Sequence, residues 1–536
     1  MCKWVISIFL WKEMVISMKE LKKIRELLDA FNEEIVYCHW KSNSHFSDAL
    51  IGVDDLDILI NRDDYAKTMK ILYSLGLKHF YTPKERTYIG IEDFLGFDEE
   101  SGIIFHLHLH TQLDIGEKHL KGFHIPLEYY ILKNRRYDEN MNVYMSSYSD
   151  ELLMLIIRAA LKLRCRDRVK EKLKNNLKNN LKNDSENNSE NKLKNNSKIT
   201  SNETVEKNAV NEFLWLKEND KEFKNYVLDL KFLSYKAKKR IISIYEKGFN
   251  TNDLLNLRDI LYNECECYSL GSKFYNTNLR HYREFKRIIF EINKRYLHKK
   301  YSFNRRRVSH GGLLIAFLGS DGAGKSSNIS EVNKWLKKVM DVRYFYLGSG
   351  DGNSSIIRLP LKYAKRLAIK LGIIKVNNNF QNDKLEDKEV KKSLGFARRI
   401  WVFTLSLERI KKLISANRCK MRGFVVLTDR FPQSEFNGLC DGPKCSEMKG
   451  MAAKLERISF KVAKNTPPDV VIKFIVSPDV AKKRKPGEID EKTSLTLTNR
   501  IKNIKFSEKT KIYEIDADKS KEEVLREVKK IVWESI

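Results

Sequence analysis

The last part of the chain alternates continuous apolar runs with amphipathic stretches. One apolar run, residues 313–318, is followed at once by a glycine-rich turn and then by apolar residues at helical spacing. Two more runs, 424–428 and 470–476, have the same continuous apolar character. Such runs are typical of strands buried on both faces of a parallel sheet. The pattern predicts an α/β domain over residues 309–536, with a parallel sheet flanked by helices.

The first part of the chain has a different pattern. Short β-like runs, 57–60 and 103–109, are mixed with helical patterns such as the amphipathic stretch 19–31. A strongly apolar helix is predicted at 150–168, with two acidic residues in its first turn. We therefore predict a small α+β domain over residues 18–168.

Two segments of different composition lie between these domains. Residues 169–208 repeat Leu-Lys-Asn-Asn units and contain no aromatic residue. Asn favours turns, and a Leu at every fourth position buries too little area to offset the entropy of ordering the chain. We expect a disordered Lys/Asn-rich insert there. Helical patterns then resume, and residues 209–304 are predicted to form a helical extension of the first domain.

Charge and composition exclude little by themselves. Lys and Arg number 100 against 71 Asp and Glu, a formal net charge of +29, which can mark a partner that is a nucleic acid or a membrane surface. No RNP-like, zinc-finger or helix-turn-helix pattern accompanies the charge, so a nucleic-acid partner is not favoured. No apolar run approaches transmembrane length. The eight cysteines form no Cys-x-x-Cys pair, which indicates a reduced, cytoplasmic protein. A homodimer, and a start at Met1 or Met18, stay open.

The turn after the 313–318 run carries a phosphate-binding pattern. Its glycines allow consecutive backbone N–H groups to face a phosphate at the N-terminus of the next helix. In this pattern Lys325 reaches the β- and γ-phosphate oxygens of a nucleoside triphosphate, and Ser326 binds Mg²⁺. The predicted nucleotide-binding residues are Gly319, Ser320, Asp321, Gly322, Ala323, Gly324, Lys325, Ser326 and Ser327.

Two further features belong with this turn. Asp429 follows the 424–428 run, and a carboxylate at the end of that strand lies near the metal in P-loop proteins. A basic helix starts at residue 477 and carries Arg484. It is either a solvated helix end or the mobile lid that P-loop kinases place there.

The motifs "GSDGAGKSS", "VVLTDRF", "PPDVVIKFIVSPDVAKKR" and "YEIDADKSKEEVLREV" resemble thymidylate kinases, in the family's order. The resemblance implies that Lys325, Asp429 and a lid arginine, Arg484, carry catalysis. It also implies that Asp321 faces the sugar of a nucleoside monophosphate, that Arg430 grips the acceptor phosphate, and that Arg409 reads the base.

The base pocket departs from that family. Leu405 stands where an aromatic residue would stack on thymine, and the family's Ala-Tyr-Gln helix is missing after Phe431. The resemblance therefore carries the catalytic frame rather than the thymidylate specificity. Weak activity on dTMP is expected, and it should rise in Leu405→Phe if the pocket geometry is otherwise retained.

The first domain has its own candidate site. Asp55 and Asp57 fall on one face of a strand, where two carboxylates can hold Mg²⁺. The stretch "HWKSNSHFSDALIGVDDLDILI" resembles the nucleotidyltransferase fold, with Ser42 in the place of the family's serine and Lys41 replacing its glycine. The strand 105–110 offers three alternating histidines and no third carboxylate. These histidines either bind a transition metal or form a polar face, and the domain is either an active transferase or an inactive module.

Taken together, these patterns predict ATP-dependent phosphoryl transfer to a small-molecule acceptor, most simply a nucleoside monophosphate. A second interpretation is a kinase for another small acceptor, such as a sugar or glycan precursor, fused to the nucleotidyltransferase-like domain. A third is a nucleic-acid-associated protein that uses ATP as a switch, which would show salt-sensitive polynucleotide affinity.

Overall fold

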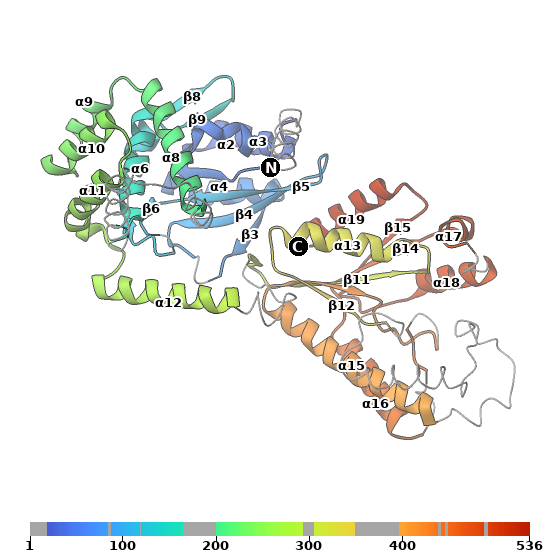
Figure 1. The fold of residues 1–536 in the computed structure, drawn as a ribbon. Coiled ribbons are helices and arrows are strands. Elements are labelled where there is room, and N and C mark those ends of the chain that lie inside the picture. The colour runs from blue at the N-terminus through green and yellow to red at the C-terminus, as the bar shows by residue number, and fades with distance from the viewer. Residues whose placement is uncertain are drawn as a thin grey trace, which may run out of the picture. The chain divides into compact units, whose positions relative to one another are not determined.

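The computed structural model describes residues 19–83, 87–117, 119–164, 167, 200–292, 305–348, 396–437, 441–444, 449–486 and 491–536. The chain forms two compact units, Met1–Phe303 and Asn304–Ile536 (Figure 1). Among the described residues, no helix has both the length and the apolar character needed to cross a membrane.

The second unit is built on a parallel sheet, which confirms the predicted α/β class. Its strand order is β12-β13-β11-β14-β15, and every neighbouring pair is parallel. The central strand β11 is fully flanked, in keeping with its continuous apolar sequence. The strands are β11 (Leu313–Gly319), β12 (Val342–Tyr346), β13 (Val425–Asp429), β14 (Val470–Ile475) and β15 (Lys511–Asp516).

Helices cover both faces of this sheet. Figure 1 shows α13 and α19 on one side of it and α15 and α16 on the other. The ring of Phe317 on β11 stacks on that of Phe474 on β14, with centroids 6.2 Å apart, inside the core between the strands. The helices are α13 (Lys325–Lys337), α15 (Phe396–Met421), α16 (Met451–Asn465), α17 (Pro478–Arg484), α18 (Glu491–Asn503) and α19 (Lys521–Ser535).

The first unit contains a mixed sheet. Its strands follow the order β3-β4-β5-β2-β1-β9-β8. The pairs β2/β5 and β1/β9 are parallel, and the other neighbouring pairs are antiparallel. The strands are β1 (Tyr37–His39), β2 (Leu56–Ile60), β3 (Lys78–Tyr81), β4 (Ile91–Asp98), β5 (Ile103–His110), β8 (Arg136–Asp138) and β9 (Val143–Met145). A small ladder joins β6 (Asp114–Ile115) to β7 (Phe123–His124).

One helix links this sheet to the helical segment. It is α6 (Tyr148–Lys162), which ends six residues before the predicted end at residue 168. Its consecutive side chains Leu152, Leu153, Met154, Leu155, Ile156 and Ile157 are all buried. A helix that is apolar on every side must be covered on every side. Side chains from the β-strands and from the helices that follow α6 in sequence form one hydrophobic cluster around α6.

The remaining helices complete the first unit. They are α2 (Lys22–Glu34), α3 (Phe46–Leu50), α4 (Tyr65–Ser74), α5 (Glu128–Lys133), α8 (Thr200–Asn219), α9 (Phe223–Asp229), α10 (Tyr235–Lys247), α11 (Thr251–Glu264) and α12 (Lys273–Ile292). The start of α8 corrects the predicted insert, because residues 200–208 are helical. Phe213 and Leu216 anchor α8 in the core, and a nucleated helix extends at little cost into polar sequence. Residues 169–199 of the predicted insert lie outside the described residues.

Candidate phosphate-binding site

The turn between β11 and α13 has the strand–turn–helix geometry of a phosphate-binding loop. Gly322 and Gly324 adopt the left-handed region, with φ of 84° and 78°, and Gly324 is the N-cap of α13. A Cβ on Gly322 would lie 3.1 Å from the carbonyl oxygen of Ala481. Glycine at 322 therefore serves both the backbone turn and the close approach of α17.

Lys325 is a buried cation at the first position of α13. Its side chain is enclosed, and its Nζ donates a hydrogen bond to the carbonyl oxygen of Ser320 at 2.6 Å. Burial, together with the positive charge of Arg430, lowers the pKa of Lys325 to about 8, from 10.5 in solvent. A neutral carbonyl compensates little of the cost of burying a charge. A phosphate group beside this ammonium would restore the missing counter-charge.

The lowered pKa of Lys325 predicts a pH dependence. Nucleotide binding requires the ammonium form, which the free protein loses as pH rises through about 8. Triphosphate affinity should therefore fall above pH 8, by up to about tenfold per pH unit for a single linked proton. The free protein should gain stability over the same range, because between pH 8 and 10.5 the unfolded chain binds more protons at this residue. Titration calorimetry at several pH values measures the first effect, and a flat affinity between pH 7 and 9.5 would contradict it.

Asp429 lies beside the phosphate-binding loop at the carboxyl end of β13. It pairs in register with Phe317 of β11 and is buried. Its Oδ1 has no hydrogen-bond partner among the described residues. Burial raises the pKa of this carboxyl group, against the opposing charges of Lys325 and Arg430. A buried carboxylate oxygen with no partner fits a cation. Ser326 follows Lys325 on the first turn of α13 and is exposed, so its hydroxyl is open to a ligand. The role of both residues as Mg²⁺ ligands stays a prediction.

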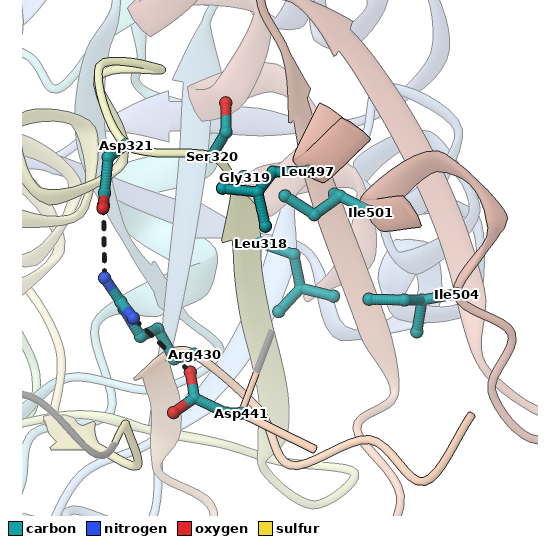
Figure 2. Close-up of a pocket in the computed structure, with 9 residues that line it drawn as sticks. All are labelled: Leu318, Gly319, Ser320, Asp321, Arg430, Asp441, Leu497, Ile501 and Ile504. Carbon is teal, nitrogen blue, oxygen red and sulfur yellow. Dashed lines mark hydrogen bonds and ion pairs between the residues drawn. The ribbon is translucent and has the colours of Figure 1, made fainter. Parts of the chain in front are cut away.

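A second group of charges faces the loop (Figure 2). Arg430 has φ of 60°, and its backbone N–H donates to the carbonyl oxygen of Phe317 at 3.3 Å. Its guanidinium lies 3.2 Å from Asp321 Oδ1 and 3.7 Å from Asp441 Oδ2. A pocket opens beside these side chains. It is lined by Leu318, Gly319, Ser320, Asp321, Arg430, Asp441, Leu497, Ile501 and Ile504.

Arg409 does not reach this pocket. Only 2% of it is exposed, and it donates hydrogen bonds at 3.3 Å to the carbonyl oxygens of Leu347 and Asp441. It also lies 3.4 Å from Asp441 Oδ1. The placement does not fit the predicted contact with a base. Arg409 instead holds Asp441, which in turn approaches Arg430.

Leu405 also belongs to the interior. It lies one turn before Arg409 on α15 and is 2% exposed. A phenylalanine there would meet core side chains, and overpacking a core costs about 1–3 kcal/mol. The expectation that Leu405→Phe raises dTMP activity therefore loses its geometric basis.

Arg484 lies beside the phosphate-binding loop. The Arg484 guanidinium donates to the carbonyl oxygen of Gly322 at 3.4 Å, and α17 carries it there. Ser477 caps that helix by accepting a hydrogen bond from the backbone of Val480. The contact brings Arg484 to the phosphate-binding loop, and the lid interpretation of this basic helix stays a prediction.

Two residues at the site had no signal in the sequence. Asp441 connects Arg430 to Arg409, and the Oγ1 of Thr498 on α18 lies 3.4 Å from the Ser320 hydroxyl. Each comes from a segment remote in sequence from the loop. An acidic residue that follows a strand directly, as Asp429 does, can be recognised, whereas Asp441 lies in irregular chain.

In the first unit, Asp55 and Asp57 share His108 and differ in their other partners. Asp57 Oδ1 lies 2.9 Å from Lys41 Nζ and 3.2 Å from ring nitrogens of His108 and His110. These groups outweigh burial and hold the pKa of Asp57 well below its usual range. Asp55 contacts His106 and also lies 3.7 Å from His108 Nδ1. Lys41 therefore already pairs with one of the two predicted Mg²⁺ ligands, and the pair itself stays a prediction.

Comparison with known proteins adds one pair of relatives. No protein-family model matches the chain. The chain is similar to the "Uncharacterized ATP-binding protein YghR" of Escherichia coli strain K12, with 29% identity over 235 residues. The match covers 41% of this chain and 86% of that protein. The protein of the same name from Escherichia coli O6:H1 (strain CFT073) matches with the same identity and coverage.

Proposed function

We propose that the unit Asn304–Ile536 binds ATP with Mg²⁺ and transfers the γ-phosphoryl group to a small phosphorylated acceptor. The phosphate-binding loop and the similarity to a protein named as ATP-binding support the ATP site. The observation that carries the proposal of transfer is the second group of charges, Arg430 with Asp321, which lines the pocket beside the loop that precedes Lys325. An ATP-dependent switch needs no second phosphate-binding cation there.

Each charged residue then has a role in positioning the reactants. Lys325 neutralises the β- and γ-phosphates, and Arg484 reaches the transferring group from α17. Mg²⁺ held by Ser326 and Asp429 would offset charge on the phosphate oxygens. An acceptor phosphate competes with Asp321 for Arg430, and Asp321 is then free to accept a hydrogen bond from an acceptor hydroxyl. In phosphoryl transfer the protein contributes mainly by positioning the reactants and compensating their charge, and little by covalent chemistry.

The acceptor is most simply a nucleoside monophosphate, by the resemblance to thymidylate kinases. The interior position of Arg409 and Leu405 favours a second candidate, a phosphorylated sugar or glycan precursor. Among the described residues, no aromatic side chain lines the pocket beside the loop; its apolar lining comes from Leu318, Leu497, Ile501 and Ile504. We therefore expect dTMP to be a poor acceptor.

A screen of acceptors tests this proposal. The full chain is incubated with ATP, Mg²⁺ and a panel of nucleoside monophosphates and sugar phosphates, and both ADP and phosphorylated product are measured. We expect ADP formation that depends on one acceptor class. Arg430→Lys should lower kcat/KM for that acceptor about 10²-fold, because lysine keeps the charge but loses the planar fork that binds phosphate oxygens. Its affinity for ATP should stay unchanged.

The exposed Arg422 provides the matched control, since Arg422→Lys makes the same substitution at the end of α15. This variant should behave as the parent does. ATP hydrolysis that no acceptor stimulates, and that Arg430→Lys leaves unaltered, would overturn the transfer proposal and leave an ATPase.

A further inference from the structure

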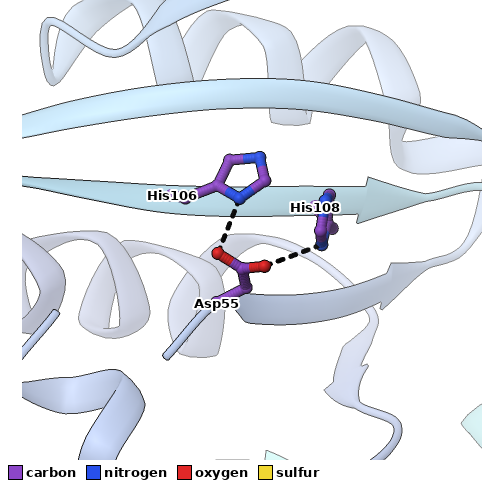
Figure 3. A group of neighbouring side chains, drawn as sticks. All are labelled: Asp55, His106 and His108. Atoms are coloured by element: carbon purple, nitrogen blue, oxygen red, sulfur yellow. Dashed lines mark hydrogen bonds and ion pairs between the residues drawn. The ribbon is translucent and has the colours of Figure 1, made fainter. Parts of the chain in front are cut away.

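Three strands of the first unit align acidic and imidazole side chains in one row. The register pairs Asp93 of β4 with His108 of β5, and His108 with Asp57 of β2. His106 and His110 project from the same face of β5, because side chains two residues apart share a face. Asp55, just before β2, completes the group (Figure 3). The first unit therefore concentrates ligand-type side chains at one position on its sheet.

Asp55, His106 and His108 have the spacing of metal ligands. One ligand atom from each lies within 4.8 Å of the others. Asp55 Oδ1 is 2.7 Å from His106 Nδ1, and Asp55 Oδ2 is 3.7 Å from His108 Nδ1. Ligand atoms about 2.0–2.1 Å from a tetrahedral ion are about 3.3 Å from one another. The two measured separations lie on either side of that value. His108 Nδ1 also lies 3.2 Å from Asp57 Oδ1, a contact that an ion bound to this nitrogen would replace.

The outer contacts orient the imidazoles as metal sites do. The other ring nitrogen of His106, Nε2, lies 2.6 Å from Asp93 Oδ1. The Asp93 side chain is itself 9% exposed. A ligating histidine commonly donates its second ring N–H to a carboxylate, which fixes the ring and its tautomer. His106 is thus held between a buried carboxylate and the carboxylate of Asp55.

One side of the cluster is accessible. The Asp55 side chain is 45% exposed and that of His108 is 25% exposed, whereas His106 is enclosed at 8%. An ion could enter from the exposed side and keep a coordination position for water. Three protein ligands with one open position characterise catalytic rather than structural metal sites.

We propose that Asp55, His106 and His108 bind one divalent first-row transition metal, with Asp93 as the orienting partner of His106. Two imidazole nitrogens favour Zn²⁺ or Co²⁺ over Mg²⁺, which prefers oxygen ligands. The site is separate in sequence and composition from the phosphate-binding loop, and its occupancy does not depend on the function proposed for that unit.

Metal binding to the full chain, free of nucleotide and chelator, tests this inference. Equilibrium dialysis against Co²⁺ or Zn²⁺, followed by elemental analysis, should give one tightly held ion per chain that millimolar Mg²⁺ does not displace. The absorption spectrum of the Co²⁺ form should show nitrogen and oxygen ligation without a thiolate band. His106→Ala and His108→Ala should each remove this ion, while the control His45→Ala, at an exposed histidine of the same unit, should retain it.

A variant of the orienting residue distinguishes a metal site from a hydrogen-bonded row. Asp93→Asn should lower Co²⁺ affinity about 10–100-fold, as loss of an outer-shell partner does. The unfolding transition of each variant, measured without metal, shows whether that variant folds. If a variant does not fold, Asp55→Asn takes its place, because the Asp55 side chain is 45% exposed and its change disturbs no core packing. Absence of saturable binding, or binding that survives His106→Ala, His108→Ala and Asp55→Asn alike, would overturn the proposal.

Discussion

Replacing Lys325 by alanine is expected to remove phosphoryl transfer, with kcat/KM lowered by about 10²–10³-fold or more. Its Nζ is the only cation on the described first turn of α13, and it contacts a carbonyl oxygen rather than a carboxylate within hydrogen-bond distance. The free protein should unfold at about the same temperature as the parent. The variant loses some packing of the aliphatic stem against Gly319 but also loses the cost of a buried ammonium group.

Lys334→Ala supplies the matched control. Lys334 lies on the same helix, is largely exposed, and pairs with Glu331 one turn earlier. Its loss should change neither kinetics nor ATP affinity. Equal turnover by Lys325→Ala and the parent would show that the glycine-rich turn is not a catalytic phosphate site.

Replacing Asp429 by asparagine is expected to lower turnover by a similar factor, about 10²–10³-fold, and to raise the free energy of unfolding at neutral pH. Asp429 carries a buried oxygen without a hydrogen-bond partner among the described residues, and burial raises the pKa of its carboxyl group. The ionised carboxylate therefore destabilises the free protein above that pKa, and asparagine removes the charge at nearly constant shape. Loss of activity with a gain of stability is typical of a site arranged for a ligand.

Steady-state kinetics over a Mg²⁺ titration and chemical denaturation measure the two effects. Asp516→Asn makes the same change at the carboxyl end of β15, where the side chain is exposed. It should leave both quantities unaltered. An Asp429→Asn protein that is fully active, or less stable than the parent, would contradict a metal-binding role.

Three strands of the second unit, β11, β13 and β14, could be predicted from sequence because each is a continuous apolar run within a short stretch of chain, whereas β12 and β15 were not predicted. The apolar run of β11 and the glycines after it specify a strand, a turn and a helix within a short stretch of chain. Asp429 could be placed for the same reason, as the residue that ends a buried strand. The first residue of α17 could also be predicted, because Ser477 is a capping residue and Pro478 follows it.

Contacts between remote segments could not be predicted. Arg409 looked available for a ligand because a sequence does not show that Asp441 and Leu347 already accept its hydrogen bonds. Asp93 was missed as a neighbour of the histidines, since its position depends on the register between β4 and β5. A shift of that pairing by one residue would place Asp93 on the other face of the sheet.

The burial of α6 limits where the chain can be truncated without exposing its hydrophobic core. A fragment that stops soon after α6 would keep the β-strands and the histidine cluster, but it would uncover the leucine and isoleucine side chains that α8–α11 normally cover. Such a surface in water invites aggregation, whatever the folding capacity of the sheet itself. Expression of separate halves is therefore best attempted at the boundary between Phe303 and Asn304, with the α8–α12 helices kept on the N-terminal half.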